Sequence, residues 1–229
     1  YSSRGVELIA KMFKPVCMLL VLWASAAMAT PRLFASLAGA PDFCGDMDCP
    51  PYKLIHETDN YEIRSYGSEK WVITNVTGSY YTVAYTEGTM RLLKYFKGAS
   101  DSGEKLNLTT PTVVAFHLTE DQKGTEKQYT FGYYLPHHIA KDPPKPTNPD
   151  VEITTYPKTT RFVKVFGGFA TDGNIVSQTK GLMDQLDKDG EKYESSMGLA
   201  AIYDAPQKLL NRHNEIHLFG HCDSYIDWE

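Results

Sequence analysis

The chain lacks an excess of positive charge. Its 229 residues include 23 Lys and Arg against 28 Asp and Glu, which gives a net charge of −5 at pH 7. Proteins that bind nucleic acid need clustered Lys and Arg to neutralise phosphates, and no basic run is present here. We therefore predict that nucleic acid is not a partner.

The common sequence signatures of catalysis are also missing. There is no G-x-S-x-G elbow for a nucleophilic serine, no H-E-x-x-H zinc motif and no phosphate-binding glycine loop. Asp184, Asp187 and Asp189 cluster near the end of a predicted helix, where a solvated acidic rim is a simpler interpretation than an acid–base pair. We predict a non-enzymatic protein with no catalytic residue and no metal site.

Long hydrophobic runs are scarce. The apolar run from Val16 to Trp23 follows Lys14 and is followed by Ala27-Met28-Ala29, the small-residue pattern of a signal-peptidase site. A run of roughly a dozen residues is too short for a bilayer, which needs about twenty. We therefore interpret residues 1–29 as upstream residues plus a signal peptide that starts at Met12, and we expect a secreted protein without stable membrane insertion.

Cysteine is scarce too, with four in the chain, of which Cys17 lies in the predicted signal peptide. Cys44 and Cys49 flank a short turn-rich stretch, and we predict a disulfide between them, with Cys222 free or in an intermolecular contact. The alternative pairs one of them with Cys222. Three reduced cysteines would be unusual in an oxidising compartment.

In a secreted protein, two N-x-[ST] tripeptides of this chain are candidate glycosylation sites. Asn75-Val76-Thr77 and Asn107-Leu108-Thr109 both lack a proline in the middle position. In a secreted chain such asparagines accept N-linked sugar if their loops are exposed. We predict glycosylation at Asn75 and Asn107.

What the chain does contain is a hidden repeat. Residues 61–66 resemble residues 151–156, and the offset of 90 persists through Gly78 and Gly168 and through Leu92 and Leu182. A fixed offset through several elements indicates duplication. Between the halves, Pro143-Pro144-Lys145-Pro146 is an extended linker that cannot be helical.

Each half predicts two strands, a helix and two more strands. Alternating and β-branched residues predict strands at 61–65, 71–76, 113–118 and 129–135, and again at 151–156, 162–166, 199–203 and 215–219. Helical spacing predicts a helix over 80–97 and a second helix capped by Asp172 or Asn174 and stopped by Gly190. We predict an α+β fold in which the two ββαββ units bury each other's apolar sheet face.

Several segments resemble the SOUL/haem-binding protein family. Residues 61–67 resemble its opening strand "YEIRxYG", residues 106–112 its "KxxMTxPV" segment, with Leu108 where methionine is usual, and residues 209–216 its "LLNRxNEVW" segment. The double-proline linker and Phe166-Gly167-Gly168-Phe169 also match, and the Cys44–Cys49 spacing resembles secreted members. The likeness covers about residues 52–219.

The resemblance implies a fold and a domain layout. The fold is a distorted eight-stranded antiparallel β-barrel with two flanking helices, in agreement with the repeat. We therefore expect a Cys-containing extension at 30–51, a SOUL domain at 52–220 with repeats at about 61–135 and 151–219, and a tail at 221–229.

The resemblance also implies a ligand, haem or a related tetrapyrrole, bound without covalent attachment. The histidine proposed as an axial ligand in some members is Ser65 here and cannot serve. Other members hold porphyrin against the first helix, with basic groups near the propionates. The corresponding residues here are Tyr85, Thr89, Met90, Leu93, Arg91 and Lys94.

Histidines give a weaker signal. His213, His217 and His221 would share one face of a strand, and we interpret that face as solvated rather than metal-binding, because strand spacing spreads the three over about 13 Å. His137 and His138 begin the linker and are candidates for weak axial ligation. We predict a secreted carrier or scavenger of tetrapyrroles; the alternative is an extracellular protein-interaction module that no longer binds haem.

Overall fold

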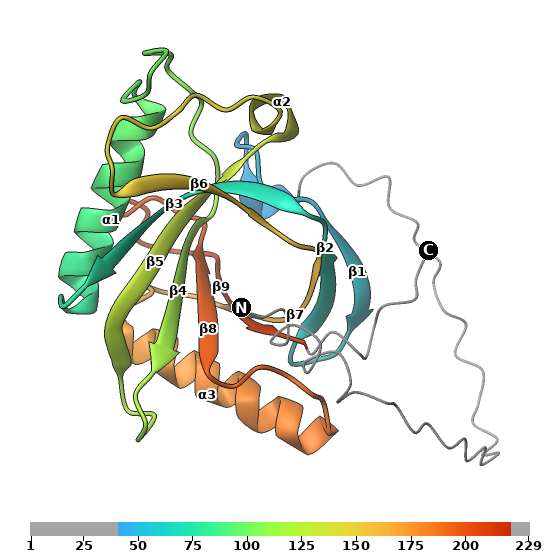
Figure 1. Ribbon diagram of the computed structural model, residues 1–229. Helices are drawn as coiled ribbons and strands as arrows, with labels where there is room; N and C mark the ends of the chain where they lie inside the picture. The colour runs from blue at the N-terminus through green and yellow to red at the C-terminus, as the bar shows by residue number, and fades with distance from the viewer. Residues whose placement is uncertain (1–40, 221–229) are drawn as a thin grey trace, which may run out of the picture. The chain divides into compact units, whose positions relative to one another are not determined.

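The computed structural model describes residues 41–220, which form a curved antiparallel sheet with helices on its outer side (Figure 1). The strands are β1 (Tyr52–Glu57), β2 (Glu62–Tyr66), β3 (Glu69–Thr77), β4 (Thr112–Leu118), β5 (Thr125–Leu135), β6 (Val151–Tyr156), β7 (Thr159–Phe166), β8 (Met197–Ile202) and β9 (Asn214–Phe219). The helices are α1 (Tyr81–Phe96), α2 (His137–Ala140) and α3 (Asp172–Asp189), and a 3-10 turn, η1, covers Asp42–Cys44. The α+β prediction is confirmed.

The sheet contains nine strands rather than eight and is open. Its order is β1-β2-β7-β9-β8-β4-β5-β3-β6, so β1 and β6 are the edges and no ladder joins them within residues 41–220. The extra strand is β1, which lies outside the repeat and, in the described part of the chain, pairs with β2 alone. The prediction of eight strands missed β1 because its burial is irregular and gives no alternating pattern.

The duplication is visible as two interlocked units. Residues 62–135 supply β2, β3, α1, β4 and β5, and residues 151–219 supply β6, β7, α3, β8 and β9. The first strand of each unit pairs with the second strand of the other, β2 with β7 and β6 with β3. A third junction pairs β4 with β8. Neither unit can therefore complete its own sheet, which explains why the halves stabilise each other.

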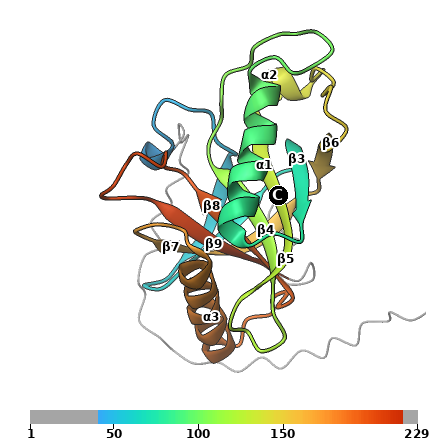
Figure 2. The same cartoon turned by 90° about the vertical axis from the view of Figure 1, so that its left-hand side faces the viewer.

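Both long helices pack on the outer face of the sheet (Figures 1 and 2). Helix α1 reaches β5 closely at Gly88, where an added Cβ would lie 2.3 Å from Phe131 Cδ2. Helix α3 is capped by Thr171, whose Oγ1 accepts from the Asn174 amide, so the predicted caps Asp172 and Asn174 are wrong. Gly190 ends α3 with φ of 74°, as predicted, because a left-handed terminus favours glycine.

The main core lies between the sheet and these helices. Strand alternation places one set of side chains toward α1 and α3, including Phe131, Phe162 and Ile216, and these meet Leu92 and Leu182 from the helices. A smaller apolar cluster, around Trp71, Val113 and Tyr203, belongs to the other side of the sheet. Among the described residues, no helix has the length and apolar character needed to cross a membrane.

Candidate functional site

A groove opens between the start of α1, the segment before α3 and the loop that joins β8 to β9. Its volume is about 200 Å³. We call it the helix groove, and its lining residues are Tyr81, Thr82, Tyr85, Thr86, Phe169, Ala170, Thr171, Ile202, Pro206 and Arg212. The lining is mainly aromatic and aliphatic, with threonine hydroxyls and one guanidinium, the mixture typical of small-molecule sites.

The helix groove lies where the two repeats meet. Four of the lining residues share one flank of α1, because they form two adjacent pairs that are four residues apart: Tyr81, Thr82, Tyr85 and Thr86. Figure 2 shows α1 and α3 on the same side of the sheet with their beginnings facing each other. The duplication therefore brings two helix N-termini to one groove.

Arg212 is the charged residue in the lining of the helix groove. Burial raises the pKa of Tyr85, and a hydrogen bond with Thr112 and the positive charge of Arg212 partly oppose this shift. Arg212 also lies over the Phe169 ring, 4.7 Å from its centroid. The groove thus combines aromatic surface with one positive charge.

The six ligand residues predicted from the sequence fall into two groups on different sides of α1. Tyr85 lines the groove, and Thr89 follows it on the same flank, buried, with its hydroxyl donating to the Tyr85 carbonyl at 2.6 Å. Leu93, half-buried, is one helical turn further. These three residues lie together, although only Tyr85 lines the groove.

The other three predicted residues lie elsewhere on α1. Met90 is exposed, and it is offset from Tyr85 by roughly 140° around the helix axis. Arg91 forms ion pairs with Glu87 and Asp150 and donates to the Asn75 carbonyl, so it faces β3 rather than the groove. Lys94 is exposed and is offset from Tyr85 by roughly 180° around the helix axis. The basic groups predicted near propionates are therefore not at the helix groove.

No histidine of residues 41–220 lines the helix groove. His137 and His138 are exposed in α2, which lies beyond the opposite end of α1 in both views (Figures 1 and 2). Ser65 is half-buried in β2, opposite Thr160. An axial histidine from these positions is not available to a ligand in this groove.

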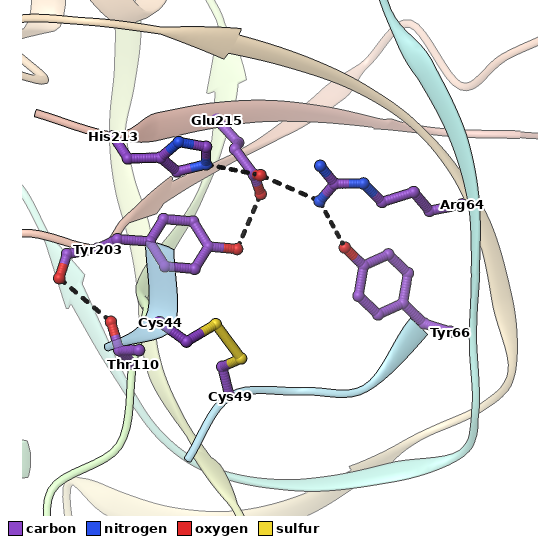
Figure 3. Close-up of a disulfide and its surroundings, with 8 residues drawn as sticks. All are labelled: Cys44, Cys49, Arg64, Tyr66, Thr110, Tyr203, His213 and Glu215. Carbon is purple, nitrogen blue, oxygen red and sulfur yellow. Dashed lines mark hydrogen bonds and ion pairs between the residues drawn. A yellow bond between two sulfur atoms is a disulfide. The ribbon is translucent and has the colours of Figure 1, made fainter. Parts of the chain in front are cut away.

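Inside the curve of the sheet lies a polar assembly, the interior cluster, formed by Arg64, Tyr66, Tyr203, His213, Glu215 and His217. Figure 3 shows all of these residues except His217. The Glu215 carboxylate is its centre. One oxygen accepts from Arg64 Nη1 at 3.0 Å and contacts His213 Nε2 at 2.9 Å, and the other accepts from Tyr203 at 2.8 Å and contacts His217 Nε2 at 2.9 Å. Every lone-pair direction of this buried carboxylate has a partner.

These contacts fix the charges of the interior cluster. Burial alone would raise the pKa of Glu215, but hydrogen bonds from His213 and His217 and the charge of Arg64 hold it well below its ordinary value. Burial lowers the pKa of His217 to about 4, although Glu215 opposes this shift. At neutral pH the cluster therefore holds an ionised Arg64–Glu215 pair and a neutral His217.

The disulfide predicted from sequence closes one side of this cluster. Cys44 and Cys49 are bonded in the structure, and Cys44 is buried. The neighbouring Phe43 ring stacks on His213 with centroids 4.1 Å apart and meets the Tyr203 ring edge-on at 4.9 Å. The loop held by the disulfide thus covers the interior cluster (Figure 3).

The prediction of a solvated histidine face is wrong. His217 is buried and bonded to Glu215, and His213 stacks on Phe43; His221 lies outside the described residues, as does Cys222. Strand alternation correctly placed His213 and His217 on one face, but that face points into the protein. Over residues 41–220, no group of His, Cys, Asp or Glu is arranged to hold a metal ion.

Beside the cluster, Glu69 is buried, and neither of its carboxylate oxygens has a hydrogen-bond partner among residues 41–220. Burial raises its pKa to about 7, and Arg161 and the nearby Trp71 indole only partly oppose this. Arg161 is itself buried, with its guanidinium 4.2 Å from the Tyr66 ring centroid. This pair of opposite charges is close enough to interact but forms no ion pair.

The two predicted glycosylation sites have exposed asparagines. Asn75 projects from β3, where its Oδ1 accepts from the Thr130 hydroxyl at 2.7 Å. Asn107 lies in the loop before β4, next to the exposed Leu108. Access of both side chains is compatible with the prediction, which stays a prediction.

Sequence reasoning missed most of the helix groove. Phe169 and Arg212 belong to segments that carried the family resemblance, but these segments were interpreted as fold motifs rather than as a site. Tyr81, Thr82 and Thr86 were inside the predicted helix, and only their proximity to residues 169–171 and 212 sets them apart. A contact between residues so distant in sequence leaves no local pattern.

Comparison with known proteins gives a consistent picture. The family model described as "SOUL heme-binding protein" matches residues 47–219. Heme-binding protein 2 of Homo sapiens is 33% identical over 159 residues, which cover 69% of this chain and 77% of that protein. Heme-binding protein 2 of Mus musculus is 31% identical over 176 residues, which cover 75% and 85%. Among solved structures, the EcmrR C-terminal domain aligns with a TM-score of 0.53 at 10% identity, covering 74% of this chain and 98% of that chain, and this likeness shows the fold alone.

Proposed function

Because this chain belongs to the SOUL heme-binding protein family, we propose that it is a non-enzymatic binding protein for haem or a related tetrapyrrole, secreted as a carrier or scavenger. The single observation that supports a site is the helix groove, with its aromatic and aliphatic lining. An apolar macrocycle gains free energy by leaving water for such a surface.

The size of the helix groove limits how much of the ligand it holds. At about 200 Å³ it is smaller than the roughly 300–1,000 Å³ of sites that enclose drug-sized ligands. It accommodates one edge of a flat macrocycle, with the rest over the surrounding surface. Exposed apolar side chains are available for this: Phe169, which lines the groove, is half-exposed, and Leu209 and Leu210 are largely exposed in the loop that supplies Pro206 and Arg212.

Binding in this groove does not depend on iron. Within residues 41–220 its lining has no histidine, cysteine or methionine, and burial raises the pKa of the lining residues Tyr81 and Tyr85, which disfavours the phenolate that binds haem iron. An axial protein ligand is therefore not part of the proposal. Haemin and metal-free protoporphyrin IX should bind with similar affinity, each saturating near one equivalent. The measurement is a titration of the folded protein followed by Soret absorbance for haemin and by tryptophan quenching for both ligands.

Two matched substitutions on α1 test the location. Thr86→Trp places a large side chain in the helix groove from an exposed position, and we expect it to weaken binding of both ligands at least tenfold. Met90→Trp adds the same bulk on the exposed outer side of α1 and should leave affinity unchanged. The reverse result would place the ligand on the sequence-predicted face around Met90. Absence of saturable binding by the folded wild-type protein would favour the interaction-module alternative.

Secretion is supported by two features. The Cys44–Cys49 disulfide is typical of oxidising compartments, and the N-terminal sequence has the pattern of a cleaved signal peptide. Expression in a secreting eukaryotic cell should release a protein whose mass falls after glycosidase treatment, and Asn107→Gln should remove part of that difference. A protein retained in the cytosol with its cysteines reduced would contradict this part of the proposal.

A further inference from the structure

A second pocket, of about 170 Å³, lies on the side of the sheet that faces away from the helices. Its walls come from four adjacent strands, β8, β4, β5 and β3. We call it the strand pocket, and its lining includes Asn75, Thr77, Gln128, Thr130, His117 and Met197. Within residues 41–220, this lining has no Lys, Arg, Asp or Glu and shares no residue with the helix groove. The strand pocket is therefore a separate, uncharged site.

His117 and Met197 are direct neighbours in the strand pocket. They are Cα partners in the antiparallel ladder between β4 and β8, so their side chains leave the sheet on the same face. Directly opposed residues have Cβ atoms about 4.5–5.5 Å apart, a spacing that lets an imidazole and a thioether reach one metal ion. Both side chains are half-buried, so an ion from solvent has access to them.

A hydrogen bond prepares the His117 ring for a metal ion. Nδ1 lies 2.7 Å from the Ser196 carbonyl oxygen, and because a carbonyl only accepts, Nδ1 carries the proton of the neutral ring. The lone pair is then on Nε2, which has no hydrogen-bond partner among residues 41–220. Metal-bound histidines almost always donate their other ring N–H to a carbonyl or a carboxylate in this way. The Glu194 carboxylate accepts from the Ser196 amide at 2.8 Å and brings a negative charge close to the ring.

The donor atoms of the strand pocket favour a soft metal ion. A zinc site needs three or four His, Cys, Asp or Glu ligands, and residues 41–220 contain no such group. Thioether ligands select Cu(I), and imidazole also suits copper. Asn75 Oδ1, a harder donor in the same pocket, already accepts from the Thr130 hydroxyl at 2.7 Å. An imidazole and a thioether without a carboxylate therefore suit a monovalent ion better than a divalent one.

We propose that His117 Nε2 and Met197 Sδ form a Cu(I) site in the strand pocket. The fixed ring tautomer of His117 and its register with Met197 present one nitrogen and one sulfur to the same space. This site goes beyond the proposed tetrapyrrole function and does not depend on it, because the two pockets lie on opposite faces of the sheet.

The first test is a Cu(I) titration in competition with a chromophoric Cu(I) chelator, with ascorbate present and oxygen excluded. The protein is produced in a bacterial periplasm, where the disulfide forms and Asn75 carries no sugar. All measurements use a Cys17→Ser/Cys222→Ser background, since free thiols bind Cu(I) far more tightly than a thioether does. We expect about one equivalent of Cu(I) to bind, and Zn²⁺ not to compete for it. Absence of Cu(I) binding by the folded protein, or displacement by equimolar Zn²⁺, would overturn the proposal.

Three variants locate the ion. Met197→Leu conserves volume, so the urea midpoint should be unchanged, whereas the Cu(I) affinity should fall at least tenfold with the loss of the thioether. His117→Gln should lower the Cu(I) affinity at least tenfold as well. Met90→Leu, which removes an exposed thioether from α1, is the matched control and should bind Cu(I) as the background protein does. Unchanged affinity in Met197→Leu would mean that the ion binds elsewhere.

A spectroscopic readout separates ligation from a structural role of the two residues. Ag(I) is a redox-stable substitute for Cu(I), and its binding should shift the methyl NMR signal of Met197. The shift should be lost in His117→Gln, and its persistence there at the same Ag(I) concentration would show that the two residues do not share an ion. Haemin affinity should be unchanged in Met197→Leu and His117→Gln, so failure of the Cu(I) site leaves the proposed function standing.

Discussion

The helix groove and the interior cluster are built from similar parts and have opposite characters. Each contains a buried arginine, tyrosine hydroxyls and an aromatic ring against the guanidinium. In the interior cluster Arg64 meets Glu215, and the disulfide loop closes over the pair. In the helix groove Arg212 donates to the neutral carbonyls of Ala205, Lys208 and Asp204 and forms no ion pair with a carboxylate within residues 41–220. The two buried arginines therefore differ in whether a buried carboxylate balances their charge.

The strongest test of this difference is Glu215→Ala. It removes the fully buried one of the two carboxylate partners of Arg64 and also the acceptor of Tyr203, so we expect a loss of about 3–5 kcal/mol in the free energy of unfolding. Urea denaturation measures it. Glu62→Ala removes the more exposed partner of Arg64 and should cost less than about 1 kcal/mol. Similar losses in the two variants would show that saturation of Glu215 is not what stabilises the cluster.

Glu69 destabilises the folded protein when its carboxyl group is ionised, so its effect on stability depends on pH. Its folded pKa of about 7 lies above the ordinary 4.5, so its contribution to stability is complete below about pH 4.5 and is lost as pH rises through 7. Glu69→Gln mimics the protonated form and should be more stable than the wild type by about 2–3 kcal/mol at pH 8, with little difference at pH 4.5. Thermal unfolding across this range measures the effect. Glu152→Gln, at an exposed position of β6, should change neither value.

The disulfide loop should matter for the interior cluster and not for the groove. Replacing both Cys44 and Cys49 by Ser removes a short covalent loop, and we expect a loss of about 2 kcal/mol in unfolding free energy. Haemin affinity should be unchanged in the folded double variant, because no residue of this loop lines the helix groove. A large change in affinity would mean that the two regions are coupled through the β8–β9 loop.

Helix α1 offers the smallest test, aimed at the groove. Gly88→Ala puts a Cβ 2.3 Å from Phe131, which forces α1 away from β5. Overpacking outweighs the gain in helix propensity, so we expect a net loss of about 1–2 kcal/mol and weaker haemin binding. Gly173→Ala in α3 meets no atom within 4 Å and should stabilise slightly, with unchanged binding. If the two variants have the same stability and the same haemin affinity, the position of α1 against β5 does not determine binding in the helix groove.

The local elements of this protein could be predicted from its sequence. Alternation gave the strands of both repeats, and helical spacing with terminal glycines gave α1 and α3 to within a residue or two. The Cys44–Cys49 disulfide also followed from spacing. These features depend on neighbours a few residues away, so their signals are present in short windows of sequence.

The candidate site was less predictable. Of the six ligand residues expected on α1, only Tyr85 lines the helix groove, and Arg91 is occupied by Glu87 and Asp150. The expectation used α1 alone, whereas the other walls come from residues 169–171 and the β8–β9 loop. The spacing of residues along one helix does not tell which of its exposed flanks another segment will cover.

Sequence by itself determined which side chains share a face, and tertiary structure decided what each face meets. In β9 the alternation of Glu215 and His217 with Ile216 and Leu218 is a typical half-buried strand, which predicts that the polar residues contact water. The curvature of the sheet and the disulfide loop bury that polar face instead, and Arg64 from β2 supplies the charge that makes its burial favourable. The period of a strand fixes its two sides, but only the approach of distant strands determines whether a side meets water, a partner or a ligand.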